Sequence, residues 1–207
     1  DSRSVNLGNR AFDSIGHERC LSALLNSPGN FTASKLAWVK ENEPYVYDKI
    51  DKIMLPGDFI AMKLTGEITT SISALSEGIF WDFQKNKISE DVMNHFGFDK
   101  KVIPEIKPLF SVHGQLKDEV AGILGLTAGI PIAYKAGDQP NNAFSLQVLK
   151  PGELATTAGT SGTVYGVCDT PLYDPHSRVN TFVHVNHSKK SPSYGVLLCV
   201  NGTGILN

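Results

Sequence analysis

The strongest constraint on the fold is an abrupt change of pattern near residue 130. The apolar segment 130–135 has the length of a buried strand, ends in Ala136-Gly137-Asp138 and leads directly into a helical stretch that continues to Val148. Before it, helical patterns dominate. After the turn Lys150-Pro151-Gly152, β-type segments follow one another at 153–157, 162–168, 179–187 and 194–200. This order predicts an α/β fold with a domain boundary near residue 150.

Helices in the first part are predicted from apolar residues recurring at three- and four-residue spacing. Either Thr32 or Ser34 could provide the N-cap of the second helix, and Pro44 breaks the pattern after it. Pro56 opens a helix that should stop at Gly66, and an acidic turn starts the one after Ser89. The predicted helices cover 17–26, 34–42, 46–54, 56–65, 89–96 and 118–124.

Composition excludes several classes of protein. The 207 residues are 41% hydrophobic and 19% charged, which is typical of a globular chain. A net charge of -2 without a basic tract argues against nucleic acid as a partner. No apolar run approaches the roughly 18 residues of a membrane span. Cys20, Cys168 and Cys199 fit neither a disulfide framework nor a zinc site, so a reducing cytoplasm is expected.

Gly137-Asp138-Gln139 is the first candidate for chemistry, because it lies on a loop between a predicted strand and a helix. A hydroxyl that attacks the γ-phosphate of ATP needs a carboxylate to orient it and accept its proton. An Asp at this place is also a favoured helix N-cap, so a purely structural role for Asp138 stays open.

Two glycine turns are weaker candidates. Small and hydroxyl residues at 155–162, among them Gly159 and Thr160, would expose backbone N–H groups to a phosphate chain. The same residues also suit a plain hairpin. Gly202 lies in a similar turn after the last predicted strand. The six histidines have no spacing suited to a metal and are expected to be surface or core residues.

The order of these features resembles the FGGY carbohydrate kinases. Four stretches carry the resemblance: FTASKLAWV at 31–39, IMLPGDFIAMKLTGE at 53–67, AGDQ at 136–139 and AGTSG at 158–162. The second stretch is most similar to the xylulose kinases within that family.

The resemblance implies an actin-like ATPase fold of two ribonuclease H-like domains, with a sugar and MgATP in the cleft between them. Residues 1–150 would be part of the sugar-binding domain, and residues 151–207 the first strands of the nucleotide-binding domain. Asp138 matches the family's general base and Gln139 a sugar or nucleotide contact. Gly159 and Thr160 match the loop near the ATP phosphates, and Gly202 a later glycine beside the nucleotide.

The expected reaction is ATP-dependent phosphorylation of a ketopentose, with D-xylulose favoured and Mg²⁺ bridging the phosphates. Glycerol, ribulose and gluconate are alternative substrates. A sugar or nucleotide sensor without turnover and a structural interaction domain are the rival classes, and a homodimer stays open. No Asp-x-Gly-Thr phosphate loop occurs in the sequence, so the chain is expected to be a fragment that is inactive alone.

Overall fold

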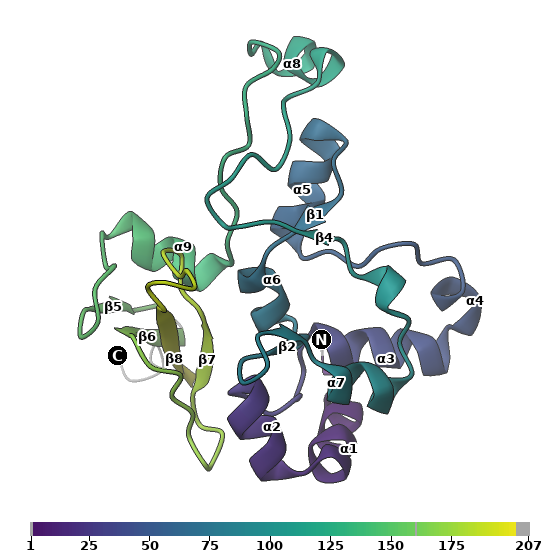
Figure 1. The fold of residues 1–207 in the computed structure, drawn as a ribbon, viewed down its shortest axis with the longest axis vertical. Helices are drawn as coiled ribbons and strands as arrows, with labels where there is room; N and C mark the ends of the chain where they lie inside the picture. The colour runs from purple at the N-terminus through teal and green to yellow at the C-terminus, as the bar shows by residue number, and fades with distance from the viewer. Residues whose placement is uncertain (1, 160, 202–207) are drawn as a thin grey trace.

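Helices form from the first part of the chain and a sheet forms from its last part, as the computed structural model of the protein shows (Figure 1). The structure describes residues 2–159 and 161–201. The helices are α1 (Val5–Ile15), α2 (His17–Leu24), α3 (Thr32–Asn42), α4 (Pro44–Tyr47), α5 (Pro56–Thr65), α6 (Ile72–Glu77), α7 (Glu90–Phe96), the 3-10 turn η1 (Lys100–Val102), α8 (Asp118–Leu124) and α9 (Asp138–Ser145). The strands are β1 (Thr69–Thr70), β2 (Trp81–Asp82), β3 (Lys87–Ile88), β4 (Glu105–Ile106), β5 (Leu154–Thr157), β6 (Ser161–Cys168), β7 (Asn180–Val183) and β8 (Tyr194–Asn201).

Several predicted helices are confirmed, together with their end signals. α5 begins at Pro56 and ends at Gly66, whose positive φ of 82° is readily adopted by glycine. α7 follows Ser89, whose hydroxyl accepts a hydrogen bond from the Val92 N–H at 3.3 Å. The predictions 17–26 and 118–124 correspond to α2 and α8. Helices α1 and α6 were not predicted.

Two expectations about helices are wrong. The N-cap of α3 is Phe31, which makes no side-chain capping bond, so neither Thr32 nor Ser34 caps this helix. Ser34 is instead buried and donates to the Pro28 carbonyl at 3.2 Å. The helix predicted at 46–54 is only the single turn of α4. The apolar residues that suggested it pack against the helical core from an irregular segment, so their spacing reflects burial and not helix.

The helical part is held by one apolar cluster. Leu24 of α2, Leu36 of α3, Leu75 of α6 and Val92 of α7 are fully or nearly fully buried in it. Burial of a leucine or valine side chain stabilises a fold by about 1.5–3 kcal/mol. These four residues come from helices far apart in sequence, so the cluster fixes where α6 lies.

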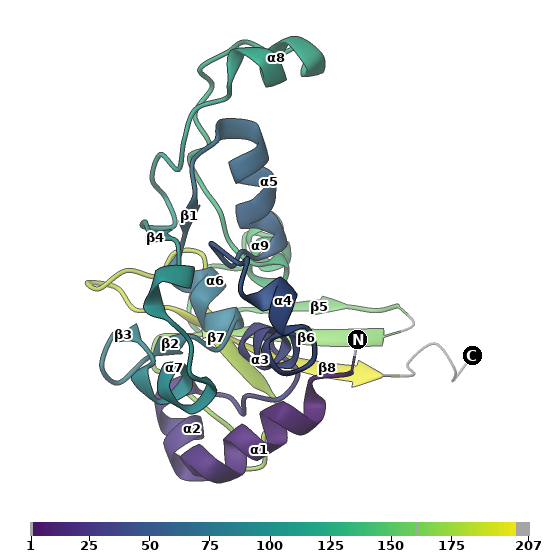
Figure 2. The same cartoon turned by 90° about the vertical axis from the view of Figure 1, so that its right-hand side faces the viewer.

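The sheet at the end of the chain is antiparallel, with strand order β5-β6-β8-β7 (Figure 2). In its centre Tyr165 of β6 lies opposite Leu197 of β8, and both are buried. Ala143 of α9 is also buried in this second cluster, so α9 covers that face of the sheet. All four β-type segments predicted from the sequence contribute a strand.

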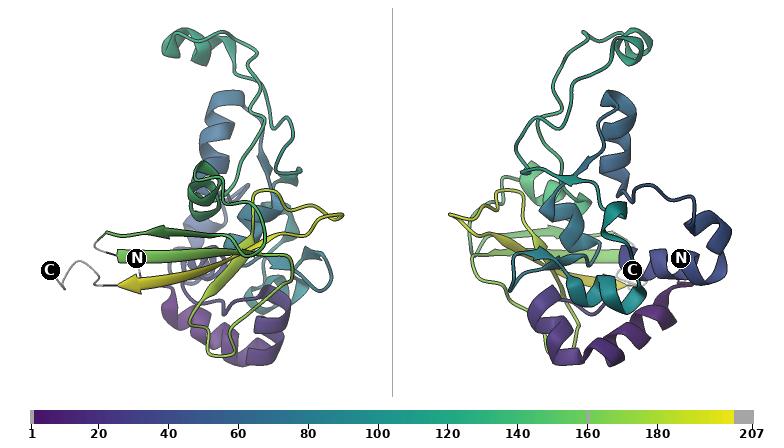
Figure 3. Two further views of the ribbon diagram at one scale, coloured as in Figure 1. Left: turned by 90° about the vertical axis from the view of Figure 1, so that its left-hand side faces the viewer. Right: turned by 45° about the vertical axis from the view of Figure 1, so that its right-hand side comes forward.

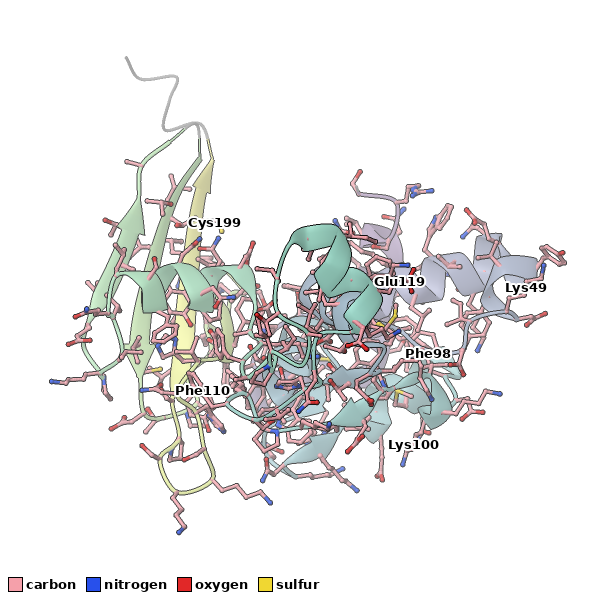
Figure 4. The ribbon with its side chains drawn as sticks, turned by 90° about the horizontal axis from the view of Figure 1, so that it is seen from above. Lys49, Phe98, Lys100, Phe110, Glu119 and Cys199 are labelled. Carbon is pink, nitrogen blue, oxygen red and sulfur yellow. The ribbon has the colours of Figure 1, made fainter. Side chains whose placement is uncertain are left out.

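Side chains from α6 and from the turn after α2 join the helical part to strand β7. Asn26 accepts the Thr181 N–H at 2.9 Å and donates to the Thr181 carbonyl at 2.8 Å. The Ser76 hydroxyl accepts the Val183 N–H at 3.1 Å. From above, the sheet that carries Cys199 stands on one side, and the helical part of the chain, with Lys49 and Phe98, on the other (Figure 4).

Helix α8 lies at the tip of an arm formed by two extended segments (Figure 3). The buried strand predicted at 130–135 runs along this arm, and that prediction is wrong. This segment belongs to none of the strands of the described ranges: it makes two isolated bridges, Phe110 with Tyr134 and Gln115 with Pro131, and a few backbone hydrogen bonds to residues 113–116, and Ile130 is 42% exposed. Lys135 alone is buried. Among the helices of the described ranges, none has the length and apolar character needed to cross a bilayer.

Candidate active site

Asp138 is the first residue of α9, and its side chain is exposed. Gly137 holds the N-cap position, so Asp138 does not cap this helix. Its Oδ1 accepts the Gln139 N–H at 2.6 Å, and a carboxylate in a first helical turn is favoured by the helix dipole. Pro140 is tolerated there because the first-turn N–H groups have no partner within the helix.

The polypeptide before α9 is fixed by Asn141. The Tyr134 hydroxyl donates to Asn141 Oδ1 at 2.6 Å, and Asn141 Nδ2 donates to the Ala136 carbonyl at 3.1 Å. The turn that presents Asp138 is therefore tied to the arm on one side and to α9 on the other.

Two adjoining cavities meet at Asp138. The larger, of about 480 Å³, is lined by residues of α5, α6 and the turn before α9, including Asp58, Ser71, Lys135 and Asn141. The smaller, of about 300 Å³, is lined by Lys35 and Phe31 from the α3 region and by Phe182 and Leu197 from the sheet. Leu55, Glu77 and Asp138 line both cavities. Both volumes suit a small-molecule ligand.

Glu77, the last residue of α6, lies directly against the Gly137 turn. A Cβ atom built on Gly137 would lie only 1.4 Å from Glu77 Oε1, so glycine is what allows this carboxyl to approach the backbone. Oε1 is buried, and no residue in the described ranges donates a hydrogen bond to it. Burial, followed by the negative charges of Asp138 and Asp58, raises the pKa of Glu77 from 4.5 to about 8.

Asp58 and Lys135 form a buried ion pair in the wall of the larger cavity. Lys135 Nζ lies 2.8 Å from Asp58 Oδ1 and also donates to the Thr69 carbonyl at 2.7 Å. The Thr70 hydroxyl donates to Asp58 Oδ2 at 2.7 Å. Both charges are therefore hydrogen-bonded, as buried charges need to be.

The other residues predicted for the site do not all converge on it. Gln139 lines the smaller cavity beside Asp138. Gly159 is exposed in the turn between β5 and β6 and lines neither cavity. Thr160 and Gly202 lie outside the described residues. Convergence of Asp138 with the turn at 159–160 stays a prediction.

The buried histidines have structural partners, as expected for core residues. His184 pairs with the Tyr165 hydroxyl at 2.9 Å and with the Val148 carbonyl at 3.1 Å. His113 lies 3.3 Å from the Thr69 hydroxyl and 3.1 Å from the Leu109 carbonyl. Burial lowers the pKa of both imidazoles.

Sequence reasoning missed Glu77, Asp58 and Lys135 as neighbours of the candidate base. Asp58 lies within the predicted helix 56–65 and Lys135 ends the strand predicted at 130–135, and neither position by itself indicates a site. Glu77 ends a helix that was not predicted, so no periodicity or motif could connect it with Asp138. Only the packing of α6 against the sheet brings it there.

The residues around Asp138 are compatible with a metal ion that arrives together with a nucleotide. No group of three or more His, Cys, Asp or Glu side chains in the described part of the chain could hold a metal ion. Mg²⁺ in phosphoryl-transfer sites commonly uses one or two carboxylates together with substrate phosphates and water. The open cavity beside Asp138 is compatible with a metal ion that arrives with phosphates.

Comparison with known families identifies the chain. The model of the N-terminal domain of the FGGY family of carbohydrate kinases matches residues 21–145, more than half of the sequence. The chain belongs to the FGGY family of carbohydrate kinases. The resemblance stated from the four sequence stretches is thereby confirmed.

Among curated relatives of this FGGY chain is a xylulose kinase of Escherichia coli (strain K12). It is 29% identical over 170 residues, which is 82% of this chain and 35% of the relative. The FGGY chain therefore spans about a third of the length of this relative.

Solved structures show the same fold. The xylulose kinase from Rhodospirillum rubrum superposes with a TM-score of 0.87 at 25% identity, over 99% of this chain and 41% of that one. A glycerol kinase from Plasmodium falciparum with ADP gives a TM-score of 0.85 at 21% identity, over 99% of this chain and 41% of that one. The expected actin-like ATPase fold is thus confirmed.

Proposed function

We propose that the protein containing this chain transfers the γ-phosphoryl group of MgATP to a hydroxyl of a small sugar or polyol, with D-xylulose as the favoured substrate. The product would then be D-xylulose 5-phosphate. The observation that carries this proposal is the placement of Asp138, an exposed carboxylate at the N-terminus of α9 that borders both cavities, in a chain of the FGGY family.

Asp138 is the proposed general base. Its carboxylate accepts the proton of the sugar hydroxyl while the hydroxyl oxygen bonds to the γ-phosphorus and the bond to the leaving ADP breaks. Because little covalent chemistry falls to the protein, positioning and charge supply most of the rate enhancement. Gln139 is the proposed neighbouring contact to sugar or nucleotide.

The nucleotide is proposed to approach the sheet. Residues 1–150 would belong to the sugar-binding domain and residues 151–207 to the nucleotide-binding domain. In this arrangement Gly159, Thr160 and Gly202 would lie near the phosphates and Mg²⁺ would bridge them. The fit of the FGGY chain onto a kinase solved with ADP supports a nucleotide-binding fold, although it carries no residue assignment.

Substrate choice rests on relatives, since the cavity walls alone do not distinguish between polyols. A xylulose kinase is among the matched relatives, and a glycerol kinase shares the fold. The direct test measures ADP release with MgATP and D-xylulose, D-ribulose, glycerol or D-gluconate on the full-length protein. We expect the highest kcat/KM with D-xylulose. Preference for another of these substrates would change the assignment within the family.

A sugar or nucleotide sensor without turnover is the alternative from another class. Such a sensor needs no base, so the presence of Asp138 beside the cavities argues against it. Saturable sugar binding without phosphorylation of any tested sugar would favour the sensor.

A further inference from the structure

Glu77 is the one carboxyl that both lines the two cavities at Asp138 and has a buried oxygen without a hydrogen-bond partner in the described ranges. Its helix is firmly placed. Ser76, the preceding residue, binds the backbone of β7, and Leu75 is buried in the helical core. The Glu77 carboxyl is therefore held at this site by two separate contacts of α6.

The charged groups around Glu77 are mainly negative or already paired. Asp58 of α5 and Asp138 of α9 act on it as negative neighbours. The cation in the larger cavity, Lys135, is bound to Asp58 at 2.8 Å. Lys35 of α3 borders the smaller cavity, and Tyr165 of β6 also lies within electrostatic reach of Glu77. An ionised Glu77 would thus add a further negative charge to this site.

We propose that Glu77 is a positioning residue that works as a neutral carboxylic acid, so that Asp138 alone carries the negative charge at the reacting hydroxyl. This inference rests on the proposed kinase function. Glu77 keeps its proton throughout the reaction, and the proton of the sugar hydroxyl goes to Asp138.

The different roles of Asp138 and Glu77 follow from the different surroundings of their carboxyl groups. Asp138 is exposed and lies in the first turn of a helix, where a carboxylate interacts favourably with the helix dipole. Glu77 has a buried oxygen beside two carboxylates, which favours its protonated form. Pairs of carboxyls separated in this way are a recurrent arrangement in acid–base sites. Neutral Glu77 also avoids repulsion of the triphosphate.

The first test observes Glu77 directly, without any assay of turnover. Carboxyl carbon NMR of glutamate-labelled protein should show one resonance that titrates near pH 8 and disappears in Glu77→Gln. Asp138→Asn removes a negative neighbour and should shift this titration to lower pH. Glu90→Gln is the matched control, because Glu90 is the first residue of α7, is paired with Lys87 of β3 and lies outside both cavities. Titration of Glu77 near its ordinary value of 4.5 would overturn the proposal.

The second test measures kcat against pH, with product formation followed by phosphorus NMR. In the unmodified protein and in Glu90→Gln, kcat should fall about fivefold between pH 8 and pH 9, as for one ionisation centred near pH 8. Glu77→Gln should abolish this fall. If kcat of Glu77→Gln falls over this pH range as much as kcat of the unmodified protein, the proposed positioning role of Glu77 is wrong.

These outcomes separate the two proposals. If Asp138→Asn retains turnover, Asp138 is not the general base and the proposed mechanism is wrong, independently of the result for Glu77. If Asp138→Asn loses turnover while Glu77 titrates normally and Glu77→Gln leaves the profile unchanged, only the inference about Glu77 fails.

Discussion

At the scale of single residues, the position of Asp138 is set by the backbone at the start of α9, and its side chain is exposed to solvent. The only hydrogen bond that the structure shows for its carboxylate within the described ranges is to the adjacent Gln139 N–H. It can therefore turn toward a bound hydroxyl without breaking a buried network. A base of this kind contributes to the rate far more than to stability.

Replacing Asp138 by Asn tests that role. The amide preserves the shape but cannot accept the proton, so kcat should fall by about 10²–10⁴ while KM changes much less. Steady-state kinetics on the full-length protein measures both. Asp118→Asn, at the start of α8 on the arm, is the matched control. Near-full turnover in Asp138→Asn would mean that another group accepts the proton.

Gly137 gives a second prediction at this scale. Gly137→Ala should destabilise the fold by about 1–3 kcal/mol, because its Cβ would displace the Glu77 carboxyl. In a Glu77→Ala background the same change should be neutral or stabilising by up to about 1 kcal/mol, since the three atoms nearest to the new Cβ, all in the Glu77 carboxyl, are removed. Denaturant unfolding of the single and double variants measures this coupling. Gly57→Ala is the control, because its Cβ would approach nothing closer than the Ala136 carbonyl at 3.9 Å. Equal costs in both backgrounds would contradict the packing argument.

At the scale of elements, the sequence predicted helix ends correctly where a proline, a glycine or a capping residue marks them. Pro56 with Gly66, and Ser89 before α7, delimit their helices by backbone and capping chemistry that is readable in the sequence. The segment 130–135 had the composition of a buried strand and still failed to form one. A strand needs a partner along its whole length, and apolar composition cannot supply that information.

The contact of Asn26 with β7 belongs to this scale too. Asn26→Ala should lower the free energy of unfolding by about 2–4 kcal/mol, because the buried N–H and carbonyl of Thr181 each lose a partner. Asn42→Ala removes only one exposed bond to the Trp38 carbonyl and should cost less than about 0.5 kcal/mol. Chemical denaturation compares the two variants. Similar losses would show that the contact between Asn26 and β7 contributes little.

At the scale of the whole molecule, buried titratable groups make stability depend on pH. The pKa of Glu77 is raised in the folded state, so its stabilising contribution is complete below about pH 4.5 and is lost as the pH rises toward 8. The pKa values of His113 and His184 are lowered, so their contribution is present above about pH 6.5 and is lost on acidification. The two effects oppose each other.

Comparing the unmodified protein with Glu77→Gln isolates the contribution of the Glu77 carboxyl to the pH dependence of stability. The stability of this variant relative to the unmodified protein should rise between pH 5 and pH 8, by at most about 1.4 kcal/mol per pH unit. Thermal or denaturant unfolding at several pH values gives the difference directly. A difference that is constant across this range would show that Glu77 is ionised in the folded state.

The candidate site illustrates what a sequence can and cannot reveal at this scale. Asp138 and Gln139 were recognisable because they are adjacent in one short motif. Glu77, Asp58 and Lys135 come from separate elements, and only the packing of α5, α6 and the arm brings them together. The division near residue 150 and the inactivity of this chain alone stay predictions.

The hydrogen bonds of Asn26 and Ser76 with β7 also bear on self-association. The outer edge of β7 has its Thr181 N–H and carbonyl and its Val183 N–H already occupied by side chains. These occupied groups make the β7 edge a poor template for a strand of a neighbouring molecule. We therefore expect another strand to add to this sheet at the β5 edge, whether in a larger fold or in an aggregate.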